Sequence, residues 1–243
     1  MNLITCQHIK EFQTQGYTIL REALSPSELN MLHDEADMLS NYLMSEGIDL
    51  LRELGGIIEP LECGYLDPSD TKYKTNQAAY CERRDQLTPG VAGFLTTSVG
   101  QWAASLLYGT TINKDQPIYL LNEQYIIKPP NTKSISAFAW HRDSDYYKDT
   151  SLRNEITVAC WMALDEVNEE NGTLMIGSTV EKVQEIIQLP AGSIVFMSSH
   201  LLHKSTGNAS SRFRRAFMPQ YAKRSMLDPD SGLPIALAIP LSP

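Results

Sequence analysis

Hydrophobic residues recur at helical spacing in three stretches of the first half of the chain. The run SPSE at 25–28 combines a capping serine, a proline in the first turn and a glutamate three residues after the cap. Apolar residues then recur every three or four positions over 29–43, so the pattern predicts a long amphipathic helix there. Shorter helices are predicted at 9–13 and 91–107, whereas 55–89 mixes Gly, Pro and polar residues and predicts loop or irregular structure.

The pattern changes to short β-rich runs from residue 118 onwards. Runs of β-branched and aromatic residues, separated by turn residues, occupy 118–127, 136–140, 156–164, 173–176, 193–197 and 213–221, and a further run lies at 16–20. Many short strands between turn signals predict a sandwich or small barrel. We therefore predict a mainly β, α+β fold in one domain: a helical part to about residue 117, a β-barrel core at about 118–222 and a C-terminal tail at 223–243.

The composition narrows the class of protein. A chain of 243 residues is enough for one well-packed core. The formal net charge is -9 and no block of Lys and Arg occurs, which argues against a nucleic-acid partner. No apolar run is long enough to cross a membrane, no secretion signal precedes the first helix, and the four cysteines show no C-x-x-C pair. We expect a cytoplasmic protein with reduced, mostly buried thiols.

Two residues in the run Trp140-His141-Arg142-Asp143 have the character of metal ligands. His141 and Asp143 are two positions apart, so on a strand both side chains point to the same face and reach one ion. An imidazole and a carboxylate suit Fe(II) or another divalent metal, although a surface histidine beside an aspartate needs no metal. His203 follows a later predicted strand and supplies a third ligand. Two histidines and one carboxylate form a facial triad that leaves iron positions open for cosubstrate and O₂.

An arginine on the last predicted strand suits a dicarboxylate cosubstrate. A keto acid that chelates iron through one end has a second carboxylate, and a guanidinium binds such a group bidentately. Arg214 lies eleven residues past His203 on the next predicted strand and is the candidate for this role, and strand alternation sets Arg215 on the opposite face. The alternative is that Arg212, Arg214 and Arg215 form a solvated basic edge.

Three runs carry a resemblance to a known family. WHRD, ITVACWMALDEVNEENGTLMIGS and LPAGSIVFMSSHLLHKSTGNASSRFRRAFMPQYA resemble the phytanoyl-CoA dioxygenase family of Fe(II)- and 2-oxoglutarate-dependent oxygenases, over roughly residues 118–222. The resemblance implies a double-stranded β-helix core of the jelly-roll, cupin-like type. It implies Fe(II), 2-oxoglutarate as cosubstrate, and O₂.

The resemblance also assigns roles to individual residues. In the family, the distal metal histidine is followed at fixed offsets by Asn, by Ser or Thr, and by the 2-oxoglutarate-binding arginine. His203, Asn208, Ser210 and Arg214 match this order. The resemblance therefore implies that His141, Asp143 and His203 hold the metal, and that His200 does not.

Further residues have weaker claims to the cosubstrate. Ser205 lies where relatives hydrogen-bond 2-oxoglutarate, and Trp161 matches a tryptophan beside it; a turn serine and a core tryptophan are equal alternatives. Asn122 and Gln124 share one strand face and are predicted to contact 2-oxoglutarate or substrate if that face is inward. Thr179 stands where the family usually has a histidine, and the segment between this motif and the distal strand is short, so one rim loop is expected to be trimmed.

We interpret the chain as a dioxygenase that oxidises a C–H bond of a small organic molecule, with hydroxylation as the default outcome. Succinate and CO₂ are released, and the setting we favour is natural-product biosynthesis, because an acidic chain disfavours the phosphates of a CoA ester. One alternative is a non-catalytic pseudo-oxygenase that binds a ligand or a partner subunit. Another is a cupin-like metal enzyme that does not use 2-oxoglutarate. The oligomeric state is not readable from the sequence.

Overall fold

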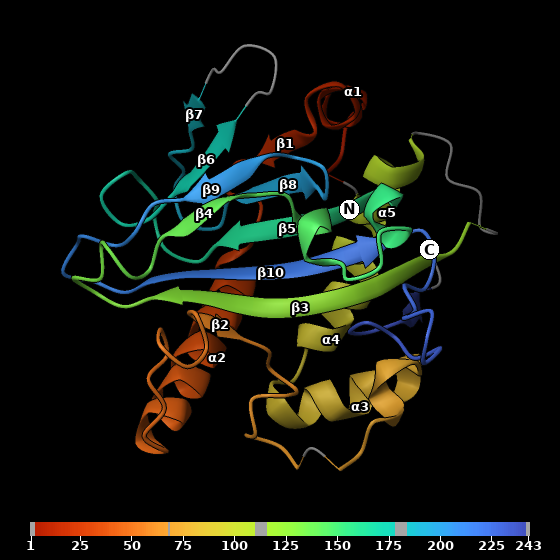
Figure 1. The fold of residues 1–243 in the computed structure, drawn as a ribbon, viewed down its shortest axis with the longest axis horizontal. Helices are drawn as coiled ribbons and strands as arrows, with labels where there is room; N and C mark the ends of the chain where they lie inside the picture. The colour runs from red at the N-terminus through yellow and green to blue at the C-terminus, as the bar shows by residue number, and fades with distance from the viewer. Residues whose placement is uncertain (1–2, 68, 110–115, 178–183, 242–243) are drawn as a thin grey trace.

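Two antiparallel β-sheets form the centre of the molecule in the computed structural model, which describes residues 3–67, 69–109, 116–177 and 184–241 (Figure 1). Thr179 lies outside the described residues. The larger sheet has the order β1-β8-β5-β10-β3-β11, with β2 also paired to β3, and the smaller has the order β4-β9-β6-β7. The strands are β1 (Tyr17–Leu20), β2 (Ile57–Ile58), β3 (Ile118–Lys128), β4 (Phe138–His141), β5 (Thr157–Ala163), β6 (Leu174–Gly177), β7 (Gln184–Ile186), β8 (Ile194–Ser198), β9 (His203–Ser205), β10 (Arg214–Ala222) and β11 (Ile239–Leu241).

This arrangement confirms the predicted mainly β fold with N-terminal helices and a jelly-roll core. The sheets also include strands from outside 118–222. Strand β1, near the N-terminus, pairs with β8, and strand β11, in the tail, pairs with β3. The short strands β2, β7, β9 and β11 were not predicted. A strand of two or three residues is too short to show an alternating pattern, so whether such a segment forms a strand depends on its pairing with a neighbouring strand.

Helices cover the face of the larger sheet that points away from the smaller sheet (Figure 1). They are α1 (Cys6–Gln15), α2 (Pro26–Ser45), α3 (Gln77–Leu87), α4 (Val91–Phe94) and α5 (Gly100–Tyr108), the last two joined by a π-helical turn at Leu95–Val99. Helix α2 begins as the sequence predicts, because Ser25 and Glu28 cap each other's backbone N–H groups. Both faces of the larger sheet are therefore covered, which explains why β5 is buried at every position.

The prediction of loop or irregular structure for 55–89 was wrong at α3. This helix of 11 residues has a weak apolar pattern because one of its inward positions is the fully buried Arg84. Arg84 forms ion pairs with Glu35 at 2.6 Å and Glu123 at 2.9 Å, and these link α3 to α2 and β3. A helix that buries a charge in place of a leucine hides its period from a search for apolar residues.

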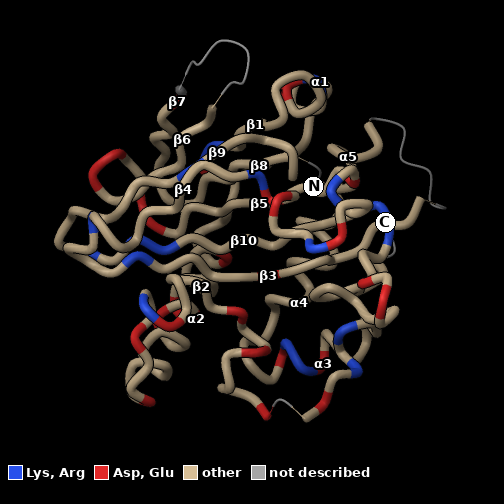
Figure 2. The backbone as a smooth tube through the Cα atoms, in the orientation of Figure 1, with Lys and Arg blue, Asp and Glu red and all other residues tan. Residues whose placement is uncertain are grey.

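Charged residues of both signs are spread along the chain, while the central strands β5 and β8 carry none (Figure 2). All four cysteines are free, but only Cys160 is buried, so the expectation of mostly buried thiols was wrong. None of the helices in the described residues is both long and apolar enough to span a bilayer. The cytoplasmic location stays a prediction.

Candidate functional site

Strand pairing brings the two candidate histidine ligands together. His141 ends β4 and His203 begins β9, and the two are direct partners across this antiparallel pair. Their ring centroids lie 4.3 Å apart. Each Nδ1 faces a backbone carbonyl two residues earlier, at 2.8 Å to Ala139 for His141 and 3.0 Å to Leu201 for His203. Since a carbonyl oxygen only accepts, both Nδ1 atoms carry the hydrogen, and each Nε2 is left with a lone pair for a metal.

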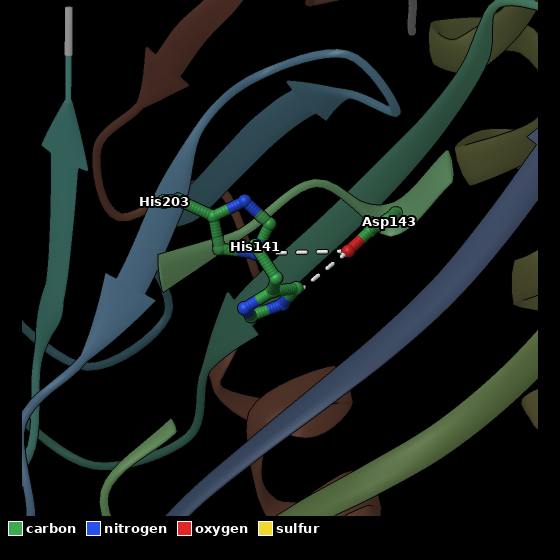
Figure 3. A group of neighbouring side chains, drawn as sticks. All are labelled: His141, Asp143 and His203. Carbon is green, nitrogen blue, oxygen red and sulfur yellow. Dashed lines mark ion pairs between the residues drawn. The ribbon is translucent and has the colours of Figure 1, made fainter. Parts of the chain in front are cut away.

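Asp143 completes the group. Its Oδ1 lies 3.8 Å from Nε2 of His141 and 3.6 Å from Nε2 of His203 (Figure 3). All three ligand atoms lie within 4.8 Å of one another, a spacing that suits one metal ion. The prediction that His141 and Asp143 share a strand was wrong, because β4 ends at His141 and Asp143 begins a 3₁₀ helix, Asp143–Tyr146. Asp145 stabilises this turn by accepting a hydrogen bond from the backbone N–H of Arg142.

Burial shapes the charges of this group. Burial lowers the pKa of His203, against the opposite effect of Asp143, so the ring is held neutral, which is the form that binds a metal. Burial also raises the pKa of Asp143, although both histidines act to lower it. A divalent cation among these three groups would stabilise the carboxylate that burial penalises.

The group lies in a cavity of about 560 Å³ between the two sheets. This volume is typical of small-molecule sites. The larger sheet lines it with Asn122, Gln124, Trp161, Met197, Arg214, Met218 and Gln220, and the smaller sheet with Phe138, His141, Leu174, His203 and Ser205. All eight site residues predicted from the sequence therefore line one cavity.

Arg214 is a buried cation without an acidic partner in the cavity wall. Its side chain is 1% exposed and lies over the ring of Trp161, at 5.7 Å from the ring centroid. Its Nε has no hydrogen-bond partner, and no ion pair joins it to any described residue. Burial lowers the pKa of Arg214 to about 9, so it remains charged at neutral pH. A buried guanidinium of this kind suits a carboxylate from a ligand.

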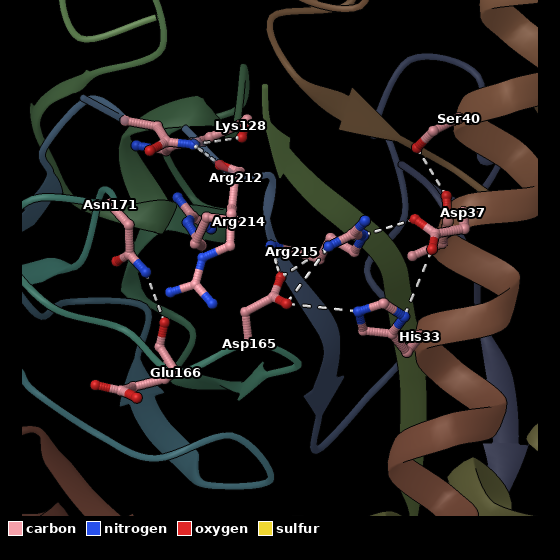
Figure 4. Close-up of polar contacts among 12 residues, drawn as sticks. His33, Asp37, Ser40, Lys128, Asp165, Glu166, Asn171, Arg212, Arg214 and Arg215 are labelled. Atoms are coloured by element: carbon pink, nitrogen blue, oxygen red, sulfur yellow. Dashed lines mark hydrogen bonds and ion pairs between the residues drawn. The ribbon is translucent and has the colours of Figure 1, made fainter. Parts of the chain in front are cut away.

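Arg212 and Arg215, the arginines near Arg214 in the sequence, have different surroundings from it. Arg215 points to the opposite face and pairs with Asp37 at 2.7 Å and with Asp165 at 3.3 Å (Figure 4). Arg212 is exposed. The alternative of one solvated basic edge is therefore wrong for Arg214, as strand alternation predicts.

Lys128 is a second buried basic side chain, and the sequence did not assign it to the site. It lies just behind the cavity wall at the end of β3 and donates to the hydroxyl of Ser205 at 2.6 Å and to the carbonyl of Thr206. Burial and the nearby Arg214 lower the pKa of Lys128 to about 5. The sequence could have indicated Lys128, because strand alternation places it on the same face as Asn122 and Gln124.

Asn208 and Ser210 stabilise the segment between β9 and β10, which positions Arg214. Asn208 is fully buried, and its Nδ2 donates to the carbonyls of Lys128, Pro129 and Arg212. Its Oδ1 accepts from Ser210. His200, by contrast, is exposed and its Nε2 faces the carbonyl of Arg153, away from the three candidate ligands.

The mouth of the cavity includes segments that the sequence pattern did not reveal. Tyr146 and Tyr147 line the cavity, whereas Tyr73 and Tyr80 are buried against the helices and Tyr65 packs edge-on against Tyr42. The tail contributes Asp228, Pro229, Pro234, Ile235 and Ala236. This segment is held in place because β11, directly after it, pairs with β3.

Residues 12–177 match the family model described as phytanoyl-CoA dioxygenase (PhyH). The match covers more than half of the chain, so this protein belongs to that family. It is an enzyme of the Fe(II)- and 2-oxoglutarate-dependent oxygenase class, which uses O₂. The match includes His141 and Asp143 and ends before His203 and Arg214. The comparison with curated proteins gives no match.

Solved structures agree with this fold. The carbocyclase SnoK from nogalamycin biosynthesis, described as non-heme and alpha-ketoglutarate-dependent, has 16% identity and a TM-score of 0.65, with 96% of this chain and 94% of that chain covered. AviO1 from Streptomyces viridochromogenes Tue57 has 18% identity and a TM-score of 0.61, with 97% and 99% covered. EvdO2 from Micromonospora carbonacea var. aurantiaca, complexed with 2-oxoglutarate, has 17% identity and a TM-score of 0.59, with 96% and 98% covered.

Proposed function

We propose that this enzyme hydroxylates a C–H bond of a small organic molecule while 2-oxoglutarate is converted to succinate and CO₂, and that His141, Asp143 and His203 hold the Fe(II). One observation carries the proposal. Two histidines and one carboxylate meet at the wall of a cavity that also contains Arg214, a buried cation without an acidic partner among the described residues. Bound Fe(II) supplies the activation of O₂ that couples decarboxylation of the keto acid to oxidation of the substrate.

The residues of the chain have separate tasks in this reaction. Arg214 receives the distal carboxylate of 2-oxoglutarate, and the hydroxyl of Ser205, held by Lys128, donates to the same group. Trp161 fixes the plane of the guanidinium by packing against it. Asn122 and Gln124 offer amide groups to the cosubstrate or to the substrate from β3, the strand that pairs with the strand of Arg214. The buried surroundings exclude water and strengthen each of these contacts.

The outer cavity favours a neutral or amine-bearing substrate. Three acidic residues, Glu59, Asp149 and Asp228, line it together with a single lysine, Lys148. The Glu59 carboxylate makes no hydrogen bond or ion pair with the described residues, and burial raises its pKa. This wall repels a substrate that carries several phosphates, such as a CoA ester. Natural-product biosynthesis fits this chemistry, and the structurally similar SnoK is a carbocyclase from nogalamycin biosynthesis.

The first experiment is an anaerobic titration of the purified protein with Fe(II) and 2-oxoglutarate, followed by visible absorption. We expect a metal-to-ligand charge-transfer band that requires both components. His203→Ala should abolish the band, and His200→Ala is the matched control that should retain it, since His200 faces the carbonyl of Arg153. A folded wild-type protein without the band would favour the non-catalytic alternative or a cupin-like enzyme without 2-oxoglutarate.

The second experiment tests the reaction and the substrate class. With Fe(II), O₂ and 2-oxoglutarate present, succinate release is measured with panels of neutral organic compounds, amines and acyl-CoA esters, and products are analysed by mass. We expect neutral or amine-bearing compounds to stimulate succinate release, with a product heavier by one oxygen atom. Stimulation by acyl-CoA esters alone would contradict the substrate class, and a product of unchanged or lower mass would contradict hydroxylation.

A further inference from the structure

Gln220 contacts Asp143, one of the candidate metal ligands. The proposed function does not explain this contact. Its Nε2 lies 3.1 Å from Oδ2 of Asp143, and its side chain is 8% exposed. No other side chain in the described part of the chain donates a hydrogen bond to this carboxylate. Because an ionised carboxylate only accepts hydrogen bonds, the amide nitrogen of Gln220, and not its oxygen, must face it.

The two oxygens of Asp143 are divided between two neighbours. Oδ1 faces Nε2 of both histidines, at 3.8 Å for His141 and 3.6 Å for His203, while Oδ2 faces Gln220. Free rotation of the carboxylate would exchange the two oxygens, and the hydrogen bond to Gln220 opposes that rotation. Asp143 depends on this support because it begins a single 3₁₀ turn, outside the strand pairing that orients both histidines.

The backbone of Gln220, by contrast, is held from both sides. Strand β10 lies between β3 and β5, and Gln220 is in register with Asn122 on one side and Ala159 on the other. The register to β3 shifts immediately after Gln220. Such irregularities often re-aim a side chain beside an active site. The rigid larger sheet thus provides the fixed point for a ligand that the smaller sheet presents on a turn.

We propose that Gln220 is a positioning residue that holds Asp143 with Oδ1 toward the metal and Oδ2 away from it. The inference rests on the proposed function, since it concerns the same candidate triad. A carboxylate that is held by one oxygen contributes one ligand, so that with two histidines three positions of an octahedral ion stay open for 2-oxoglutarate and O₂. Partners that orient a ligand in this way commonly contribute about 10- to 100-fold to metal affinity.

The test uses Gln220→Met, which keeps the length of the side chain and removes the donor. Met218→Leu is the matched control, because Met218 lies two residues earlier on the same strand, lines the same cavity and carries no hydrogen-bond donor in its side chain. Anaerobic Co(II), as a stand-in for Fe(II), is titrated into each protein, and its affinity and visible d–d spectrum are recorded. Circular dichroism checks that each variant folds.

We expect Gln220→Met to bind Co(II) about 10- to 100-fold more weakly than wild type and with an altered d–d spectrum, and Met218→Leu to match wild type in both. A role limited to packing would change thermal stability and leave the spectrum as it was. Gln220→Leu, with a different shape, repeats the test if the methionine variant does not fold. Wild-type affinity and spectrum in a folded Gln220 variant would overturn the inference alone. A wild-type protein that binds no Co(II) would overturn the proposed function as well.

Discussion

Two buried arginines lie on opposite sides of the larger sheet and have opposite surroundings. On the helix-covered side, Arg84 is fully buried and pairs with both Glu35 and Glu123. Tyr80 and Tyr125 also donate to these carboxylates. On the cavity side, Arg214 is 1% exposed and has no carboxylate partner among the described residues.

The difference separates a structural charge from a binding charge. A buried cation is tolerated when its partners are present at all times, and Arg84 meets this condition within the folded chain. Arg214 does not, because it has no carboxylate partner among the described residues and its pKa of about 9 keeps it charged at neutral pH, so the cavity side carries uncompensated positive charge. An anion of the size of a dicarboxylate would compensate it. The predictions below separate these two kinds of charge.

Arg84→Met should have the largest effect, on stability. Removing the cation leaves Glu35 and Glu123 facing each other in the interior, and breaking a buried ion pair from one side costs about 3–5 kcal/mol of unfolding free energy. Urea denaturation measures the loss. Arg83→Met is the control, because Arg83 is also buried but donates to a backbone carbonyl and forms no ion pair with a carboxylate in the described part of the chain. Equal losses in the two variants would contradict the role given to the ion pairs.

Arg214→Met should leave stability nearly unchanged and should weaken binding of 2-oxoglutarate instead. The ligand-free variant should unfold with a free energy within about 1 kcal/mol of wild type, because no carboxylate among the described residues is left unpaired. The affinity for 2-oxoglutarate should fall by about 10- to 100-fold, the worth of a hydrogen-bonded charge pair. Calorimetry in the presence of an inert divalent metal measures the affinity. Arg212→Met, on the exposed neighbour, should change neither quantity; unchanged affinity in Arg214→Met would favour the cupin-like alternative.

Lys128→Met should change how stability depends on pH. Lys128 titrates at about 5 when folded and at 10.5 in its ordinary state, so between these values the unfolded chain holds a proton that the folded chain lacks. The unfolding free energy of wild type should therefore rise with pH in this window. The variant lacks this contribution, so its stability relative to wild type should decrease steadily over the roughly three pH units from pH 6 to pH 9. Lys133→Met, on an exposed lysine, is the control; parallel curves for Lys128→Met and wild type would contradict the prediction.

Ser205→Ala should have the smallest effect. It removes one neutral hydroxyl between Lys128 and the cavity, which is worth about 1 kcal/mol, or roughly fivefold in 2-oxoglutarate affinity. Ser211→Ala, on an exposed serine of the following loop, should leave the affinity unchanged. A loss as large as that of Arg214→Met would mean that Ser205, and not the arginine, dominates binding of the cosubstrate.

Much of the fold could be predicted because it depends on local patterns. The capping residues of α2 and the β-rich runs of β3, β5, β8 and β10 lie within a few residues of the predicted positions. Helix α3 was missed since Arg84 occupies an inward position, and its partners Glu35 and Glu123 are 49 and 39 residues away in the sequence. A local sequence pattern does not reveal partners that lie so far away in the sequence.

The sequence by itself determined which chemistry the chain carries: the H-x-D pair, a later histidine, and an arginine eleven positions beyond it. The tertiary structure decided which of these groups meet and how they are held. Pairing of β4 with β9 sets His141 beside His203, a contact between Lys128 and Ser205 spans 77 residues, and Gln220 reaches Asp143 across the same separation. The physical reason is that side-chain direction follows from local backbone geometry, whereas the partner of a buried polar group is decided by strand register and packing between distant segments.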